Sequence, residues 1–367
     1  MAHDTIVIGA GVMGSAIALR LAAAGQRVLV LEKSVPGAEA SSAAAGILGP
    51  QVEAEQDGPL FRLTLASRDR YPDFIADVEE RSGHATGYRR SGVVRAALDE
   101  HELRQLALER DWQRRAGLSF EVLSADECRR AEPALGPRVA GGLHFRDEAQ
   151  VDAQALAQAL PVAARRAGAC FERAAVASVA IENGRAVGVR TDSGTIPAAA
   201  VVLAAGAWTS LVAGSLLPPD AIAPVRGQMV LLAGAIAGSP HAVIFGPHGY
   251  LVPRDAGRVL LGSTMERVGF DKRVTAAGVA SILAAALELA PDLADATLES
   301  SWAGFRPAPR DGLPLLGSLL PGLFVASGHH RNGILLTPVS AELVAGAVLG
   351  RTPALDVTPF RPDRFAS

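Results

Sequence analysis

One short segment close to the N-terminus constrains the fold of this chain more than any other. Residues 5–33 read TIVIGAGVMGSAIALRLAAAGQRVLVLEK, and this pattern predicts a strand, a tight turn, a helix and a second strand. Residues 6–8 and 28–31 are the two apolar strand runs, and Gly25 is placed to end the helix between them. The order of these elements predicts a crossover unit of a doubly wound α/β fold.

The turn in this unit has the glycine spacing of a dinucleotide-binding site. Gly9, Gly11 and Gly14 stand between the strand and the helix, which is the context that the motif requires. Gly9 permits the turn, Gly11 lets the backbone approach a pyrophosphate, and Gly14 allows close packing of the helix on the strand. The helix N-terminus favours an anion. Glu32, after the second strand, would accept a hydrogen bond from a ribose hydroxyl, which argues against the 2′-phosphate of NADP.

The next segment bears on which dinucleotide is bound. After Glu32 the chain enters residues 37–53, GAEASSAAAGILGPQVE, which are rich in small residues and hydroxyls. Such a loop can lie with its backbone against a cofactor, although an ordinary linker can have the same composition. An NAD-dependent dehydrogenase would fit the glycine turn but would leave the last third of the chain unexplained.

Charge, cysteine and histidine usage narrow the classes of partner. The formal net charge of -3 provides no broad positive field for nucleic acid or an anionic membrane. Cys128 and Cys170 form no redox or metal motif, so free thiols and a cytoplasmic location are expected. Residues 193–219 carry no formal charge, but Pro197 and two glycines interrupt them, and no membrane span is predicted. The eight His residues show no metal-ligand spacing, and no metal site is predicted.

The middle of the chain predicts a mixture of helices and hairpins. Residues 60–80 have helical spacing around a break at Pro72, and residues 99–117 have the pattern of a further amphipathic helix. A later helix is expected to kink or break at Pro161. Strand-like runs separated by turn residues between 174 and 205 predict a β meander.

Several stretches of the chain together resemble one family of flavoproteins. They are GAGVMGSAIALRLAAAGQRVLVLEK (residues 9–33) with GAEASSAAAGILGPQVEAE, then VVLAAGAWTS, GYLVPRDAGRVLLGSTME, SWAGFRPAPRDGLPLLG and LFVASGHHRNGILLTP. These stretches are spread over nearly the whole chain. They resemble the FAD-dependent D-amino-acid oxidase and sarcosine oxidase family, most closely its bacterial glycine oxidase branch, which is associated with thiamine biosynthesis.

The resemblance implies a fold of two domains. A Rossmann-like FAD-binding domain of the glutathione-reductase type would be discontinuous, formed by residues 1–85, 145–218 and 303–367. A substrate domain with an antiparallel sheet would be inserted in two pieces, residues 86–144 and 219–302. The family also implies a homo-oligomer, a tetramer.

The resemblance further implies which residues contact the cofactor. The backbone of Val176 would meet the adenine, and a helix N-terminus after Gly328 would point at the pyrimidine edge of the flavin. No cysteine lies near this last motif, so FAD is expected to be noncovalent. His330 stands where relatives commonly carry an aromatic residue. Besides the glycine turn, Glu32, Val176 and His330, the expected contacts are Val12, Met13, Lys33, Ser41, Ser42, Ala45, Gly46, Ile47, Gly206, His329, Arg331, Asn332, Gly333, Ile334 and Leu335.

Substrate recognition is expected to centre on Arg306. Oxidation of an amino acid requires that its carboxylate be anchored while the Cα hydrogen faces the flavin, and an Arg fork provides such an anchor. Arg306 follows WAGF, is held by Pro307, and matches the family's carboxylate-binding position. The resemblance adds Tyr250 and Met265 as pocket residues, and Arg331 as a residue that faces the flavin or the substrate. A structural salt bridge remains the alternative role for Arg306.

These residues together predict oxidative deamination of glycine or another small amino acid. The hypothesis is hydride transfer from Cα of the neutral amine to flavin N5, after which the imine hydrolyses to an oxo acid and ammonia. Molecular oxygen would then take up the electrons to give hydrogen peroxide. No catalytic acid or base is assigned. The alternatives are a D-amino-acid dehydrogenase that reduces a quinone, an oxidase of sarcosine or other N-methyl amino acids, and a noncatalytic flavoprotein.

Overall fold

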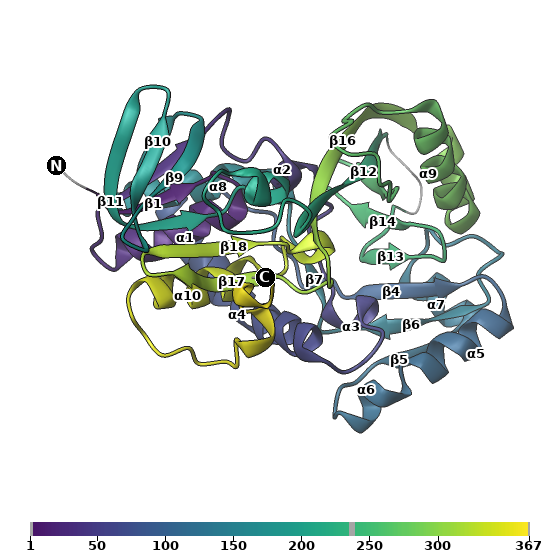
Figure 1. Cartoon of the computed structure of the whole chain (residues 1–367). Coiled ribbons are helices and arrows are strands. Elements are labelled where there is room, and N and C mark those ends of the chain that lie inside the picture. Colours follow the sequence, from purple (N-terminus) through teal and green to yellow (C-terminus); the bar gives the residue numbers. More distant parts are fainter. Residues whose placement is uncertain (1–2, 235–238, 366–367) are drawn as a thin grey trace.

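The first crossover lies where the sequence predicts it. β1 (His3–Ile8), α1 (Val12–Ala23) and β2 (Val28–Glu32) follow one another, and the two strands pair in parallel. The computed structural model describes residues 3–234 and 239–365. The chain forms two lobes, each built on an eight-stranded sheet (Figure 1).

β1 lies in the interior of the first sheet, which has the strand order β17-β18-β11-β1-β2-β8. β11 pairs in parallel with both β1 and β18, whereas β17 is antiparallel to β18. β9 and β10 continue from β11 as the predicted antiparallel meander. The remaining strands of this sheet are β8 (Cys170–Arg173), β9 (Val176–Glu182), β10 (Arg185–Thr191), β11 (Gly194–Leu203), β17 (Leu315–Leu320) and β18 (Leu323–Ser327).

Both faces of the first sheet are buried. Successive side chains of β2 point to opposite faces, so Val30 joins the core under the helices and Leu29 joins the core on the other side. The helical layer contains α1 together with α4 (Pro59–Ser82), α8 (Ala153–Arg166) and α10 (Thr337–Val348). This arrangement places the N-terminus of α1 at the carboxyl edge of the parallel strands, where α/β sheets bind their ligands.

The second sheet forms the other lobe and has the strand order β16-β12-β15-β14-β13-β4-β6-β5. Its long strands β12 and β16 are antiparallel neighbours, and β16 faces the first lobe (Figure 1). The strands are β4 (Val93–Ala97), β5 (Glu121–Ser124), β6 (Gly141–Phe145), β12 (Ile222–Ala233), β13 (Val243–Phe245), β14 (Tyr250–Pro253), β15 (Val259–Gly262) and β16 (Thr297–Pro309). The helices of this lobe are α5 (Glu100–Glu109), α6 (Asp111–Arg115), α7 (Ala125–Ala131) and α9 (Ala276–Leu289).

Two prolines do not interrupt their helices as predicted. Pro72 lies inside a continuous α4, and Pro161 lies inside a continuous α8. Tyr71 and Phe74 are buried on either side of Pro72. Packing on both sides therefore holds the helix together despite the lost backbone hydrogen bond, whose absence costs about 3 kcal/mol or more in an isolated helix.

Residues 99–117, predicted as one helix, form two helices, α5 and α6. Asp99 caps α5, its carboxylate accepting a hydrogen bond from the backbone N–H of Glu102 at 2.8 Å. Arg110 separates the two helices. Its buried guanidinium donates a hydrogen bond to the carbonyl of Val52 at 3.2 Å. That long-range contact fixes the position of Arg110 and was invisible in the local pattern.

Short elements connect the two lobes. α2 (Ala40–Ala43), β3 (Ile47–Leu48) and α3 (Pro50–Glu53) follow the first crossover, and β3 pairs with β7 (Ala149–Gln150). The predicted domain boundary at residues 302–303 falls inside β16, so this strand continues from one predicted domain into the other. The division into domains stays a prediction.

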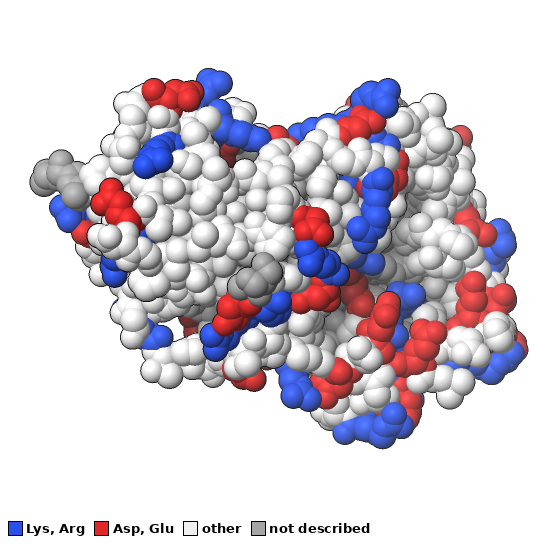
Figure 2. All heavy atoms as spheres, in the orientation of Figure 1, with Lys and Arg blue, Asp and Glu red and all other residues white. Residues whose placement is uncertain are grey.

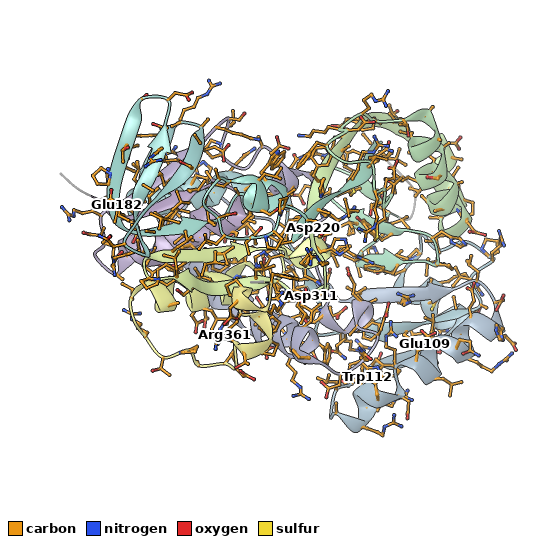
Figure 3. The ribbon with its side chains drawn as sticks, in the orientation of Figure 1. Glu109, Trp112, Glu182, Asp220, Asp311 and Arg361 are labelled. Atoms are coloured by element: carbon orange, nitrogen blue, oxygen red, sulfur yellow. The ribbon has the colours of Figure 1, made fainter. Side chains whose placement is uncertain are left out.

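The two lobes differ in how many charged side chains they show on the visible face. Charged side chains gather around α5 and α6, whereas the first lobe shows a largely uncharged face in the same view (Figure 2). Glu182 at the end of β9 and Glu109 on α5 mark opposite ends of the molecule (Figure 3). In the described part of the chain, no helix is both long enough and apolar enough to cross a membrane.

Candidate active site

A cavity of about 400 Å³ lies between the two lobes, and its wall includes residues of both sheets. Most of the site residues predicted from the sequence line this cavity. They are Gly9, Gly11, Val12, Met13, Glu32, Lys33, Ser41, Ala45, Gly46, Ile47, Val176, Gly206, Tyr250, Arg306, His329, His330, Arg331, Gly333 and Ile334. Five predicted residues do not line it, namely Gly14, Ser42, Met265, Asn332 and Leu335.

Two positions of the glycine turn, Gly9 and Gly14, have no room for any side chain. Gly9 has φ of +101°, and a Cβ there would lie 2.6 Å from the carbonyl oxygen of Ala204. A Cβ on Gly14 would lie 2.0 Å from the carbonyl oxygen of Gly9. Gly14 does not line the cavity, and its role is to let α1 pack closely behind the turn.

Glu32 fixes the shape of the turn from the end of β2. One carboxylate oxygen, Oε2, accepts a hydrogen bond from the backbone N–H of Ala10 at 2.9 Å. The other, Oε1, accepts from Ser34 N–H at the same distance. Glu32 thus organises the cofactor end of the cavity in addition to lining it.

The small-residue loop after β2 packs against the N-terminus of α1. The hydroxyl of Ser41 accepts a hydrogen bond from Val12 N–H at 3.0 Å. Gly46 has φ of +74°, and a Cβ there would lie 1.9 Å from the carbonyl oxygen of Val151. The loop is therefore held closely on both sides, and its backbone forms part of the cavity wall.

Lys33 and Trp208 form a contact that the sequence did not reveal. The ammonium nitrogen of Lys33 lies 3.8 Å from the centroid of the Trp208 ring, within the range of a cation–π interaction. Both residues line the cavity. Nothing in the local pattern of the segment GAWTS predicts this contact with the lysine.

The segment that follows β18 differs from the predicted helix N-terminus. Residues His330–Asn332 form a single 3-10 turn, and α10 begins only at Thr337. The winding nevertheless starts earlier, because Leu336 N–H donates to the carbonyl of Asn332 at 2.7 Å. Of the predicted contacts in this segment, Asn332 and Leu335 do not line the cavity.

The two adjacent histidines have different environments. His329 is buried at the cavity wall, its Nε2 lies 3.1 Å from the hydroxyl of Ser340, and burial lowers its pKa to about 3. His330 lines the cavity, and burial together with nearby guanidinium groups lowers its pKa to about 4. These groups belong to Arg306, Arg331 and Arg267. Both imidazoles are therefore neutral near pH 7.

Arg306 projects from β16 into the opposite end of the cavity. Its guanidinium donates hydrogen bonds to the carbonyl of Thr264 at 3.1 Å and to the hydroxyl of Ser263 at 2.8 Å. Within residues 3–234 and 239–365, no carboxylate forms an ion pair with Arg306. The alternative role as a structural salt bridge is therefore not seen, and the cation retains donors for a ligand.

Of the two predicted pocket residues Tyr250 and Met265, only Tyr250 lines the cavity. Tyr250 on β14 lines the cavity, and its hydroxyl donates a hydrogen bond to the sulfur of Met229 at 3.5 Å. Met265 does not line the cavity, and its side chain is 56% exposed. The neighbouring Glu266 turns inward to pair with Arg226 at 2.5 Å, which leaves Met265 on the outer side of the extended chain. This structure therefore gives no support to Met265 as a pocket residue, and that role stays a prediction.

Glu53 is a cavity residue that sequence reasoning missed. It lies at the end of α3 and pairs with Arg331 across the cavity wall, with 3.2 Å between Oε2 and Nη2. An acid that closes a loop of small residues was the available signal.

The residues of the cavity fit a flavin dinucleotide. Gly11 at the N-cap of α1 provides no side-chain cap, and the first turn of α1 contains no acid, so the helix N-terminus can accept a pyrophosphate. Glu32 lies at the dinucleotide end, and the guanidinium of Arg306 lies in the wall of the same cavity. The fold and the site together define an oxidoreductase that uses a dinucleotide cofactor, with a cationic substrate end.

Comparison with known proteins identifies the family. Residues 4–347 match the family model described as FAD dependent oxidoreductase. The chain is 38% identical to a glycine oxidase of Geobacillus kaustophilus over 98% of this chain and 96% of that protein. A crystal structure of glycine oxidase from the same organism matches with a TM-score of 0.94 over 99% of both chains. The chain therefore belongs to the FAD dependent oxidoreductase family.

A second relative has a longer chain. The bifunctional protein ThiO/ThiG of a Synechocystis species is 36% identical over 99% of this chain, which spans about half of that protein, 54%. The predicted class of enzyme, its FAD dependence and its fold class are thus confirmed.

Proposed function

We propose that the protein oxidises glycine and other small amino acids to an oxo acid, ammonia and hydrogen peroxide. For glycine, one molecule each of oxygen and water is consumed, and glyoxylate is formed. Bound FAD supplies the acceptor for the two electrons and the hydrogen that leave Cα, and it returns the electrons to oxygen. The similarity to glycine oxidases over the whole chain supports this substrate class.

The observation that carries the proposal is the unpaired guanidinium of Arg306. Arg226 on the neighbouring strand provides a contrast, because it pairs with Glu266 at 2.5 Å and with Asp271 at 3.4 Å. Arg306 has only a hydroxyl and a carbonyl as partners among the described residues. A substrate carboxylate would satisfy this cation by charge-assisted hydrogen bonds, each worth about 1.5–3 kcal/mol.

The remaining groups at this end favour a small, uncharged amine. Tyr250 and Met229 form an apolar wall with one hydroxyl, and His330 is neutral near pH 7 because its pKa is lowered to about 4. None of these side chains provides a negative charge that would hold an ammonium group, and the carboxylate of Glu53 is paired with Arg331. We assign no catalytic acid or base, and the roles of these side chains are to orient the substrate and exclude water.

The physiological setting follows as a further part of the proposal. The resemblance to the glycine oxidase branch implies that the oxidation of glycine serves thiazole formation in thiamine synthesis. The two unpaired cysteines, Cys128 and Cys170, support a reducing compartment, and we infer a cytoplasmic enzyme. FAD would be noncovalent, since neither cysteine lines the cavity. A tetramer stays a prediction, to be checked by light scattering of the purified protein.

Oxygen consumption and peroxide formation test the proposal. The purified yellow protein would be assayed with glycine, sarcosine, D-alanine and D-proline, with ammonia or methylamine quantified as the second product. Ammonia and peroxide from glycine are expected in equal amounts. If substrate bleaches the flavin while oxygen is not consumed and a quinone is reduced, the enzyme is a dehydrogenase. If only the N-methyl substrate reacts, with release of methylamine or formaldehyde, the sarcosine alternative holds.

A further inference from the structure

The hydrogen-bond donors around Arg306 are only partly used within the protein. An arginine side chain has five N–H donors. One bonds to the carbonyl of Thr264 at 3.1 Å and one to the hydroxyl of Ser263 at 2.8 Å, and the others have no acceptor among the described residues. The hydroxyl of Ser263 shares this property. Its oxygen accepts from Arg306, while its own O–H has no acceptor in the described part of the chain.

Ser263 differs in this respect from another serine of the cavity wall. Ser263, Ser327 and Ser41 all line the cavity, and Ser41 lies at the cofactor end, beside the N-terminus of α1. The hydroxyl of Ser327 accepts from Thr209 at 2.9 Å and donates to the carbonyl of Gly206 at 3.0 Å. Its hydrogen is therefore used inside the protein. The hydrogen of Ser263 is free and stands beside a cation, where a carboxylate oxygen can accept it.

The residues on both sides of Ser263 fix its position. The side chain of the following residue, Thr264, accepts a hydrogen bond from Gln228 N–H at 2.9 Å and donates one to the carboxylate of Glu266 at 2.6 Å. The backbone before Ser263 packs against Tyr250, because a Cβ on the preceding glycine would lie 2.5 Å from the phenol oxygen. The serine hydroxyl is therefore held at the cavity wall, between the guanidinium and the phenol.

We propose that Ser263 binds the substrate together with Arg306, its hydroxyl donating a hydrogen bond to the substrate carboxylate. This inference rests on the proposed function, in which Arg306 binds the same carboxylate. The hydrogen bond from Arg306 to the serine oxygen polarises the O–H group, and hydrogen bonds that follow one another in a chain strengthen each other. A carboxylate at Arg306 thus meets both donors, while the contact between the two side chains is kept.

Binding of a carboxylate that cannot be oxidised tests the proposal apart from turnover. (Methylthio)acetate has one carboxylate, and sulfur replaces the amine. It would be titrated into the holoenzyme while the visible spectrum of the flavin is recorded. We expect Ser263→Ala to raise the dissociation constant about ten- to hundred-fold, the change that one hydrogen bond to a charged group provides. Ser263→Thr keeps the hydroxyl and should retain most of the affinity.

A double-mutant cycle with Arg306→Lys separates direct contact with the ligand from an indirect effect on the arginine. Lysine keeps the positive charge but has no guanidinium fork for Ser263 to hold. If the hydroxyl contacts the ligand, adding Ser263→Ala to Arg306→Lys should again raise the dissociation constant about ten-fold or more. If the double variant binds like Arg306→Lys alone, Ser263 acts only by holding the guanidinium, and the inference is overturned.

Ser327→Ala is the matched control, because it removes a hydroxyl of the same wall whose hydrogen already has an acceptor in the protein. We expect it to bind the ligand like the wild type. If alanine at residue 263 causes loss of FAD, Ser263→Cys takes its place, since a thiol is of similar size and only a weak donor. Wild-type affinity in the variant used would overturn the inference. Binding that still depends on Arg306 would then leave the proposed function standing, whereas wild-type binding in Arg306→Met would contradict the proposed function itself.

Discussion

The guanidinium of Arg306 lies directly over the backbone of Gly227 on the adjacent strand. A Cβ at residue 227 would fall 2.1 Å from Nη1 of Arg306. The two residues belong to antiparallel neighbours β12 and β16, where Gly227 is paired with Gly304. The absence of a side chain at Gly227 is what allows the guanidinium to lie in the cavity and reach Ser263 and Thr264.

Gly227→Ala should therefore impair substrate binding more than folding. The added methyl group must push the guanidinium aside, and a flexible side-chain end can move without unfolding the sheet. A displacement of about 1 Å at a positioning group can reduce activity about 100-fold. We expect the KM for glycine to rise at least ten-fold, with FAD content and melting temperature close to wild type, as measured by steady-state kinetics and thermal unfolding.

Gly346→Ala is the matched control, because a Cβ there meets no heavy atom closer than 3.9 Å. This variant should have the KM of the wild type. If Gly227→Ala also retains that KM, the position of Arg306 is unimportant for binding. If Gly227→Ala instead loses FAD or unfolds, the glycine serves packing.

Glu32→Gln should weaken FAD binding. The amide retains one acceptor for the N–H groups of Ala10 and Ser34 but loses the charge and the second acceptor. Charge-assisted hydrogen bonds contribute about 1.5–3 kcal/mol, so we expect the dissociation constant of FAD to rise about 10- to 100-fold. Dilution of the holoenzyme with a record of flavin fluorescence measures this change. Glu39→Gln, on the same cavity wall, should shift the affinity less than three-fold, and equal losses in both variants would count against a specific role of Glu32.

Glu148 should make the stability of the protein decline as pH rises. It is fully buried, and burial raises its pKa to about 8 although Oε1 accepts hydrogen bonds from Gln51 and Val52 N–H. The folded state therefore keeps a proton that the unfolded state loses above its ordinary pKa of 4.5. The free energy of unfolding falls between these two pH values, with a slope of up to ~1.4 kcal/mol per pH unit.

Glu148→Gln removes the titrating group while it keeps an acceptor for the same N–H groups. Urea unfolding of the holoenzyme between pH 5 and pH 9 measures the effect. Relative to wild type, the variant should become more stable as pH rises through this window. Parallel stability curves for the two proteins would show that Glu148 is ionised in the folded state.

Local spacing was sufficient to predict the cofactor end of the site. The strand, the glycine turn and Glu32 lie within 33 residues, and hydrogen bonds inside that segment determine their geometry. Arg306 was found for a different reason, because a chemical requirement for a carboxylate anchor coincided with a family motif. Among the residues that the structure describes, Arg306 has no acidic partner, and this depends on how the second sheet folds, which could not be predicted.

Residues that long-range contacts position could not be placed from the local sequence pattern. The ion pair of Glu266 with Arg226 sets the path of the loop after β15, and this pair turns Met265 outward. Glu53 reaches Arg331 only because residues 278 positions apart in the chain meet at the cavity wall. Pro72 and Pro161 stay within helices because tertiary packing outweighs their local preference.

Anaerobic reduction of the flavin by glycine most directly tests the assignment of Arg306 in an amino-acid oxidase. Holoenzyme would be mixed with glycine without oxygen, the flavin absorbance followed against glycine concentration, and oxygen then readmitted with quantification of peroxide. In the wild type we expect saturable bleaching and one peroxide per flavin. In Arg306→Met, the glycine concentration for half-maximal bleaching should rise at least 100-fold, and Arg306→Lys should be intermediate. Bleaching of Arg306→Met at wild-type glycine concentrations, or no bleaching of the wild type, would contradict the assignment.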